Sequence, residues 1–272
     1  MITHQHKDDA EINILIRKFE QLNLESRSAT LYVHCSLNNL KSICTVKSIF
    51  SAFDYYFDKN STLCMPGFPY NDRQFETYMS DPGVFDVNKT PAHVSLLSEV
   101  FRRKQDTFRS LHPWASVCAS GKYAREITSE HHKHEDSFSV LSPFRKIVEM
   151  EGYVIGLGLD CNTNSFIHIA DNELQQYANN PGFMDYYSDK DFACLDHSGN
   201  LTSVRCNVVN QTIRSKIKPR KMKSSYLETD FYREQNINDI NFYSIKLKPF
   251  IRYTINQNRS LVEKNLWPSH FC

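Results

Sequence analysis

The sequence predicts an α/β fold in which helices cover both faces of a sheet, that is, a three-layer α/β/α sandwich. Two observations lead to this prediction. Segments with apolar residues at helical spacing alternate with short apolar runs rich in β-branched and aromatic residues. Proline, glycine and serine stand at the boundaries of these segments, where they typically begin or end helices and strands. No repeat, low-complexity segment or linker divides the chain, so we expect a single domain over residues 1–272.

The first part of the chain alternates helix and strand. Helical spacing of apolar residues predicts helices at 12–22 and 46–57, and the apolar runs 30–33 and 61–65 predict strands. Residues 71–89 are polar, with Asp, Pro and Gly but no clear period, which predicts a long surface loop at about 70–90. Thr90 and Pro91 then predict the start of a helix that runs through residue 101.

The later part contains one more clear helix and strand. Ser142 and Pro143 predict a helix that stops at Gly152, and the run 153–159 predicts an apolar strand. Thr163 is a candidate cap for a further helix that carries Asp171. From about 180 to 272 the pattern weakens, and we expect an irregular region of hairpins and short helices.

Composition excludes several classes of function. The 32 basic and 31 acidic residues leave a net charge of +1, so no global field favours nucleic acid or an acidic membrane. The mean hydropathy of −0.50 and the lack of a long apolar run argue against a spanning helix, and the first residues do not resemble a secretory signal. Eight scattered cysteines are typical of reduced cytoplasmic thiols. We therefore expect a cytoplasmic protein that binds neither nucleic acid nor membrane.

Six segments carry motifs in a characteristic order and spacing. They are LYVHCSLNNL (31–40), LCMPGF (63–68), TPAHVSLLSEVFRR (90–103), FRSLHPWASVCASG (108–121), LSPFRKIVEMEG (141–152) and VIGLGLDCNTNSFIHIADN (154–172). Together they resemble the aminoglycoside 3-N-acetyltransferase family. The resemblance implies a central mixed sheet that differs from the common GNAT fold. It also implies transfer of an acetyl group from acetyl-CoA, or of another acyl group from its CoA ester, to a sugar amine, without a metal.

Two turns are the expected contacts of CoA. The first lies between a predicted strand and a helix, where open α/β sheets bind ligands, and contains His34, Cys35, Ser36 and Leu37. Its backbone amides and the Ser36 hydroxyl could bind pantetheine or phosphate, although Ser36 could equally serve only as a helix cap. The resemblance assigns a second turn to CoA, with Arg109, Ser110, His112, Ser116 and Val117, and it adds Ser142. From the residues alone, His112 could instead satisfy backbone carbonyls near Pro113, and Ser142 could be only a helix cap.

His168 is the expected general base. If a helix opens at Thr163, then His168, Asp171 and Asn172 share one face, and the carboxylate can orient the imidazole. Attack on a thioester requires an unprotonated amine, so a base must accept its proton. We expect donors near Ser36 to stabilise the oxyanion that forms. The family has Glu where this chain has the shorter Asp171, and a structural role for His168 is the alternative.

The acceptor is expected to be an aminoglycoside or a nucleotide-linked amino sugar used for surface polysaccharide. A polycationic aminoglycoside needs carboxylates, which the polar loop could supply through Asp72, Glu76, Asp81 and Asp86. Asn172 is a further candidate for substrate binding. The basic run 214–223 suits an acceptor with a phosphate group and slightly favours the nucleotide sugar.

Alternatives from other functional classes stay open. The protein could bind CoA or a sugar without transfer, or it could be an amide hydrolase with a Cys–His–Asp set that uses Cys35 or Cys118. The group His131, His132, His134 and Glu135 suggests a metal site at first sight, but we expect an exposed helix end or loop there. Nothing in the sequence indicates the oligomeric state.

Overall fold

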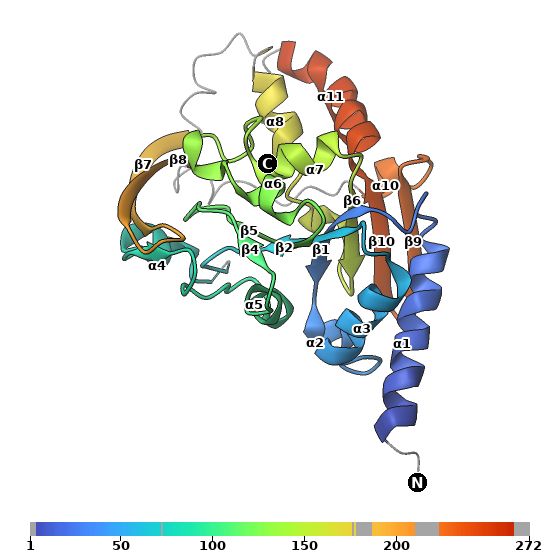
Figure 1. The fold of residues 1–272 in the computed structure, drawn as a ribbon. Coiled ribbons are helices and arrows are strands. Elements are labelled where there is room, and N and C mark those ends of the chain that lie inside the picture. Colours follow the sequence, from blue (N-terminus) through green and yellow to red (C-terminus); the bar gives the residue numbers. More distant parts are fainter. Residues whose placement is uncertain (1–3, 72, 176, 178–186, 210–222, 264–272) are drawn as a thin grey trace.

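The computed structural model describes residues 4–71, 73–175, 177, 187–209 and 223–263. Its main sheet has seven strands in the order β4-β5-β2-β1-β6-β10-β9 (Figure 1). The central strands β1 (Thr30–Cys35), β2 (Thr62–Pro66) and β6 (Tyr153–Leu157) run parallel. The antiparallel strands are β4 (Phe108–Arg109), β5 (Val117–Gly121), β9 (Tyr232–Ile237) and β10 (Ile240–Lys246). The sheet is therefore mixed, as expected.

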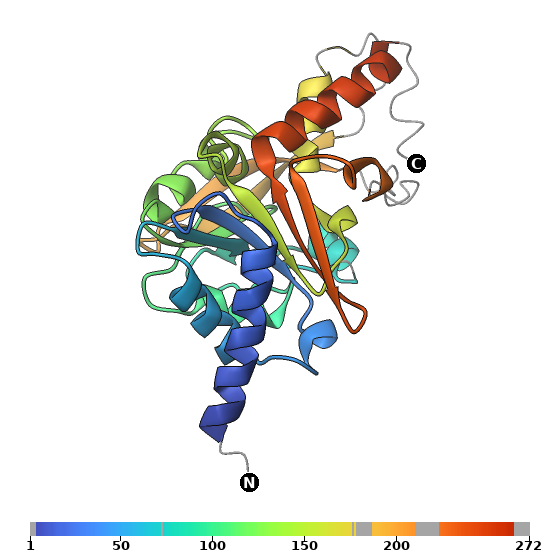
Figure 2. The ribbon, with the colours of Figure 1, turned by 90° about the vertical axis from the view of Figure 1, so that its right-hand side faces the viewer.

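Helices cover both faces of this sheet, which confirms the three-layer prediction (Figures 1 and 2). One face carries α1 (His4–Gln21), α2 (Leu37–Leu40), α3 (Val46–Tyr56) and α5 (Leu96–Arg102). The other carries α6 (Ala124–Thr128), α7 (Pro143–Glu149), α8 (Ile167–Gln175) and α11 (Leu247–Glu263). Along β1, Leu31 and Val33 join the core under the first set of helices, and Tyr32 joins the core under the second. Strands covered on both faces are apolar along their whole length, which explains the continuous apolar runs of the sequence.

A second sheet contains β3 (Phe85–Asp86), β7 (Tyr187–Leu195) and β8 (Leu201–Val209). β7 and β8 form an antiparallel hairpin, and β3 pairs with the end of β7. The helix α4 (Phe75–Ser80) packs beside this sheet through Tyr78, whose ring stacks on Phe192. The segment 70–90 is therefore not the plain surface loop that we expected. Phe75 and Phe85 are buried in it and tie α4 and β3 to the core.

Two predicted helix starts were wrong. α5 begins after Ser95, whose hydroxyl accepts the backbone N–H of Ser98, whereas the Thr90 hydroxyl closes the preceding turn by accepting the N–H of Asp86. Residues Cys161–Thr163 form a short 3-10 turn, and α8 starts only at Ile167. The side chain of Asn164 takes the capping role expected of Thr163, because its Oδ1 accepts the N–H of Phe166.

The region from about 180 onward is more regular than we expected. Its described parts, 187–209 and 223–263, contain two hairpins, the short helix α10 (Lys223–Tyr226) and the 17-residue helix α11. The prediction of hairpins is confirmed, but α11 is long and β9 and β10 extend the main sheet. Within the described ranges, no helix combines the length and the apolar character that crossing a bilayer requires.

Candidate active site

The carboxyl ends of β1 and β6 form the sheet edge at which the first predicted CoA turn lies. Ser36 follows β1, and its backbone N–H donates to the carbonyl of Leu157 at the end of β6 at 3.0 Å. Ser36 occupies the N-cap position of α2, but its side chain makes no bond to that helix. The interpretation of Ser36 as only a helix cap is therefore wrong, and its hydroxyl is not used to hold α2.

His168 stands in the first turn of α8 with a carboxylate beside it. Its Nδ1 lies 3.1 Å from Oδ2 of Asp171, so the two side chains share one helix face as predicted. A carboxylate only accepts hydrogen bonds, so Nδ1 carries the hydrogen and Nε2 keeps a lone pair that can take a proton. The His168 side chain is 38% exposed and that of Asp171 is 17% exposed. The imidazole is therefore not a core residue, and it is accessible from outside.

Asn172 holds a neighbouring segment onto α8. Its Nδ2 donates to Oδ1 of Asp136 at 2.8 Å, and the same oxygen accepts the backbone N–H of Phe138 at 2.8 Å. The ring of Phe138 thereby lies against His168, with 5.2 Å between ring centroids. Sequence reasoning missed Asp136 and Phe138, because no local pattern links them to a helix more than 30 residues later. Contact between Asn172 and a substrate stays a prediction.

The predicted second CoA turn is buried, and its polar side chains are bonded inside the protein. The Arg109 guanidinium donates to the carbonyls of Gly67 and Thr90 and to the Ser116 hydroxyl, which itself donates to the Gly67 carbonyl. Val117 follows as the first residue of β5 and is also buried. Burial lowers the pKa of Arg109 to about 10, which leaves it charged at neutral pH. These side chains fix the shape of the turn, and their contact with CoA stays a prediction.

Two buried histidines stack beneath this turn. The rings of His112 and His131 are 4.0 Å apart between centroids. His131 accepts from the Ser110 hydroxyl at Nδ1 (3.0 Å) and lies 3.0 Å from the Ser137 carbonyl at Nε2, so Nε2 carries the hydrogen. His112 accepts the N–H of Ala115 at Nδ1 (2.9 Å) and does not satisfy a carbonyl near Pro113 through that atom. The exposed helix end expected at 131–135 is therefore wrong for His131, which is fully buried.

These imidazoles predict a loss of stability in mild acid. Burial lowers the pKa of His131 to about 3 and that of His34 to about 4, and it also lowers the pKa of His112. Below the usual histidine pKa of 6.5, the unfolded chain gains protons that the folded chain does not take up. The free energy of unfolding should fall from about pH 6.5 down to about pH 4, by on the order of 1 kcal/mol per pH unit for each imidazole.

Urea unfolding at pH 7.5, 6.0 and 5.0 measures this slope. The variant His131→Gln keeps one hydrogen-bond acceptor and one donor. The slope of its unfolding free energy against pH should be smaller than that of wild type by the contribution of one imidazole. The matched control is His197→Gln, at an exposed position in the turn between β7 and β8. Equal slopes for wild type and His131→Gln would contradict the assignment of a neutral buried ring.

Ser142 caps α7, and the carboxylates expected to bind the acceptor are dispersed. The Ser142 hydroxyl is buried and accepts the N–H of Arg145 at 3.1 Å. Glu76 is exposed in the first turn of α4, Asp81 ends that helix, and Asp86 accepts backbone N–H groups of the following turn. Asp72 and the basic residues from 214 to 221 lie outside the described residues. Binding of the acceptor by Asp72 and Glu76 stays a prediction.

The two cysteines proposed as nucleophiles are held as thiols. Burial raises the pKa of Cys35 to about 12 and that of Cys118 to about 11. A thiolate is the reactive form of cysteine, so both environments disfavour a hydrolase that uses these residues. Among the residues that the structure describes, no group of three or more His, Cys, Asp and Glu side chains could hold a metal ion.

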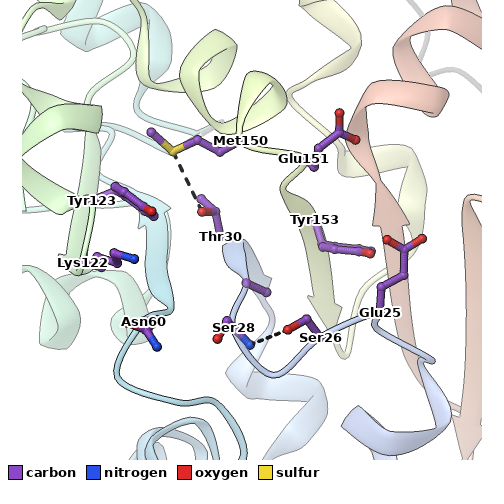
Figure 3. Close-up of a pocket in the computed structure, with 11 residues that line it drawn as sticks. Glu25, Ser26, Ser28, Thr30, Asn60, Lys122, Tyr123, Met150, Glu151 and Tyr153 are labelled. Carbon is purple, nitrogen blue, oxygen red and sulfur yellow. Dashed lines mark hydrogen bonds between the residues drawn. The ribbon is translucent and has the colours of Figure 1, made fainter.

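A pocket of about 520 Å³ lies at the opposite edge of the sheet, at the amino ends of β1 and β6 (Figure 3). Lys122 and Tyr123 line one side of it, and Glu25 and Glu151 line the other. The two carboxylates are already paired, Glu25 with Lys246 at 2.6 Å and Glu151 with Lys248 at 2.8 Å. Because the His168–Asp171 pair and Ser36 follow the carboxyl ends of strands, this pocket is separate from them.

Comparisons with known proteins identify the family and the fold. The family model described as aminoglycoside 3-N-acetyltransferase matches residues 32–257. The chain is 36% identical over 77 residues to aminoglycoside N(3)-acetyltransferase III of Pseudomonas aeruginosa, a match that spans only 28% of each protein. Its fold is similar to that of sisomicin-bound AAC-VIa, with a TM-score of 0.73, 15% identity and coverage of 92% of this chain and 97% of that one.

The fold is also similar to that of AAC-IIIb in a binary complex with CoASH. The TM-score is 0.71 and the identity is 16%, with coverage of 92% of this chain and 97% of that one. At such identities the structural likeness shows the fold alone. The family model, in contrast, matches most of the chain and includes most of β1, the buried second turn and the His168–Asp171 pair. The protein therefore belongs to the aminoglycoside 3-N-acetyltransferase family.

Proposed function

We propose that the protein transfers an acetyl group from acetyl-CoA to an amine of an aminoglycoside, with His168 as the general base. One observation carries the proposal. The oriented and accessible imidazole of His168 stands at the start of α8 with Asp171 on its Nδ1, within a chain that belongs to this family. The CoASH complex of AAC-IIIb and the sisomicin complex of AAC-VIa support the choice of donor and acceptor.

The reaction is a direct transfer in a ternary complex. The neutral amine attacks the thioester carbonyl carbon, and Nε2 of His168 accepts the proton that the nitrogen loses as the new C–N bond forms. The C–S bond then breaks, and the departing sulfur takes that proton to give CoASH. Asp171 keeps the Nδ1 hydrogen in place throughout and stabilises the imidazolium that forms between the two steps.

The donor is proposed to lie along the turns at 34–37 and 110–117. In the first turn, His34, Cys35, Ser36 and Leu37 contribute the carboxyl end of β1 and the start of α2, and the Ser36 hydroxyl is not occupied by a cap bond. The second turn contributes its surface shape, which the bonds of Arg109, Ser110, His112 and Ser116 hold. The reaction is proposed to occur in the cytoplasm, where acetyl-CoA is made, and within one domain.

The aminoglycoside is preferred over the nucleotide-linked amino sugar. The latter was favoured by the basic run 214–223, which falls almost entirely outside the described residues and carries no structural argument. The name of the Pseudomonas aeruginosa relative and the ligand of AAC-VIa both point to aminoglycosides.

A thiol-release assay tests the function. Purified protein is incubated with acetyl-CoA in four reactions: without an acceptor, with sisomicin, with gentamicin, and with a UDP-linked amino sugar. The CoASH released in each reaction is then titrated. Release with sisomicin or gentamicin only is the expected result. Release with the UDP sugar only would show that the acceptor is the nucleotide-linked amino sugar and not the aminoglycoside. Release without any amine would indicate a hydrolase, and no release would indicate a binding protein.

Replacing the orienting carboxylate tests the role given to Asp171. In Asp171→Asn the side chain no longer stabilises the imidazolium, and its amide can hold the wrong tautomer of His168. We expect kcat to fall by about tenfold or more, which is a fraction of the 10²–10⁴-fold that general base catalysis contributes. Asp171→Glu, which restores the family residue, should lose much less. Glu173→Gln, on the same helix but paired with Arg145, is the control, and an equal loss in both Asn and Gln variants would contradict the role.

A further inference from the structure

Asn164 carries a buried amide nitrogen that the fold does not use. The residue is only 4% exposed. Its Oδ1 accepts the backbone N–H of Phe166 at 3.1 Å and so caps the approach to α8. Its Nδ2, in contrast, has no hydrogen-bond partner within the described part of the chain. The side chain is therefore fixed at one end and unsatisfied at the other.

An unsatisfied buried donor is costly and needs an explanation. A donor left without a partner in the interior has lost its hydrogen bonds to water and gained none in return, so folded proteins rarely contain one. The cap alone does not require it, because Asp or Ser accepts the same N–H and buries no amino group. This chain uses Ser142 in that way at the start of α7. The Nδ2 group is thus better explained by a partner that is present only when a ligand is bound.

The position of Asn164 in the fold indicates which group of a ligand could accept a hydrogen bond from its Nδ2. Asn164 lies between the carboxyl end of β6 and α8, four residues before His168. His34 supplies a second orphaned atom, because the residue is 8% exposed and its Nε2 has no partner among the described residues. Tyr32 connects the two positions, since its ring centroid lies 5.1 Å from that of His34 and 5.1 Å from that of Phe166. The His34 ring and the Phe166 ring thus both pack on Tyr32, and the Asn164 side chain is bonded to the backbone of Phe166, which brings the two residues with unpaired nitrogens to the same aromatic group on the α8 side of the sheet.

We propose that Nδ2 of Asn164, with Nε2 of His34 as a second donor, binds the carbonyl oxygen of the acyl thioester. The inference rests on the proposed acetyl transfer and assigns the oxyanion donors of that reaction. When the amine nitrogen bonds to the carbonyl carbon, the C=O electron pair moves to the oxygen, and the two N–H groups stabilise the negative charge. The pair returns to re-form C=O as the C–S bond breaks and the sulfur leaves with the proton from His168. The ligand is thus a thioester carbonyl, and the Ser36 region keeps only the role of holding CoA.

The variant Asn164→Asp separates the two ends of the side chain. Its Oδ1 can still accept the N–H of Phe166, while an oxygen replaces the donor. We expect kcat to fall by about 10²–10³-fold, the loss typical of one oxyanion donor. The KM for sisomicin and the Kd for CoA should stay within about threefold of wild type. Asn162→Asp, the same change at an exposed position two residues earlier, should leave kcat unchanged. A kcat of Asn164→Asp within threefold of wild type would overturn the inference.

Two further measurements do not depend on Asn164→Asp, and the second does not depend on turnover. Asn164→Ser removes the amide donor without placing a carboxylate in the interior, and its shorter hydroxyl should not replace that donor, so it should show the same loss in kcat. Acetonyl-CoA, a ketone analogue of acetyl-CoA, should bind wild type more tightly than CoASH does, and its carbonyl stretch should move to lower frequency on binding. An unshifted carbonyl band would overturn the inference even if wild type acetylates sisomicin. A shifted band in a protein that acetylates no amine would overturn the proposed function and support the carbonyl site.

Discussion

The variant His168→Ala is expected to lower kcat for acetylation of sisomicin by about 10²–10⁴-fold, because it removes the group that accepts the amine proton. The Kd for CoA should stay nearly unchanged, since the loss is confined to one side chain that is 38% exposed at the start of α8. Steady-state kinetics with sisomicin as the varied substrate and calorimetry with CoASH measure the two quantities. Added imidazole should restore part of the lost rate in this variant by acting as an external base.

His197→Ala is the matched control for this prediction. His197 is exposed in the turn between β7 and β8, outside the proposed site, and its removal should leave kcat and the Kd for CoA unchanged. A kcat of His168→Ala within threefold of wild type would remove His168 from the mechanism. A large loss in both kcat and CoA binding, together with a lower melting temperature, would assign His168 to structure.

The variant Arg109→Met should show the largest loss of stability among the changes considered. The guanidinium is buried and holds the carbonyls of Gly67 and Thr90 together with the Ser116 hydroxyl. Methionine fills a similar volume but removes all three of these donated bonds. The Thr90 carbonyl then loses the Arg109 donor and the Gly67 carbonyl keeps only the bond from the Ser116 hydroxyl, and a buried group left unpaired costs about 1–3 kcal/mol. We expect the free energy of unfolding to fall by about 2–5 kcal/mol, as measured by urea unfolding at neutral pH.

Arg252→Met is the control, because Arg252 is exposed on α11 and its replacement should change stability by less than about 0.5 kcal/mol. The same pair of variants distinguishes the two roles considered for Arg109. If Arg109 holds only the turn, the folded fraction of Arg109→Met should bind CoA with nearly wild-type affinity at low temperature. A variant with unchanged stability but much weaker CoA binding would instead show that Arg109 contacts CoA.

Local patterns were sufficient for most elements of the fold. The helices α3 and α7 and the strands β1, β2 and β6 lie close to their predicted positions, because apolar periodicity and the cap at Ser142 act within a few residues. The helix α1 ends near its predicted end but begins earlier than predicted, at His4. The starts of α5 and α8 were misplaced, since Thr90 and Thr163 have the chemistry of caps but stand in turns. The segment 70–90 was misjudged because Phe75 packs against the ring of Trp114 and Phe85 pairs with Cys194 of β7, two residues that lie far away in the chain.

The sequence by itself determined the layered α/β architecture, the family motifs and the pairing of His168 with Asp171, because these depend on residues near one another in the chain. The tertiary structure alone decided which polar side chains are bonded within the fold and which are not. Arg109 and Ser142 have the chemistry of ligand-binding residues, but their bonds lie within the protein. Asn164, which the sequence did not single out, caps the turn before α8 through its Oδ1, and its Nδ2 is buried without a partner in the described structure. Hydrogen-bond satisfaction depends on groups that distant segments bring into contact, and no local pattern contains that information.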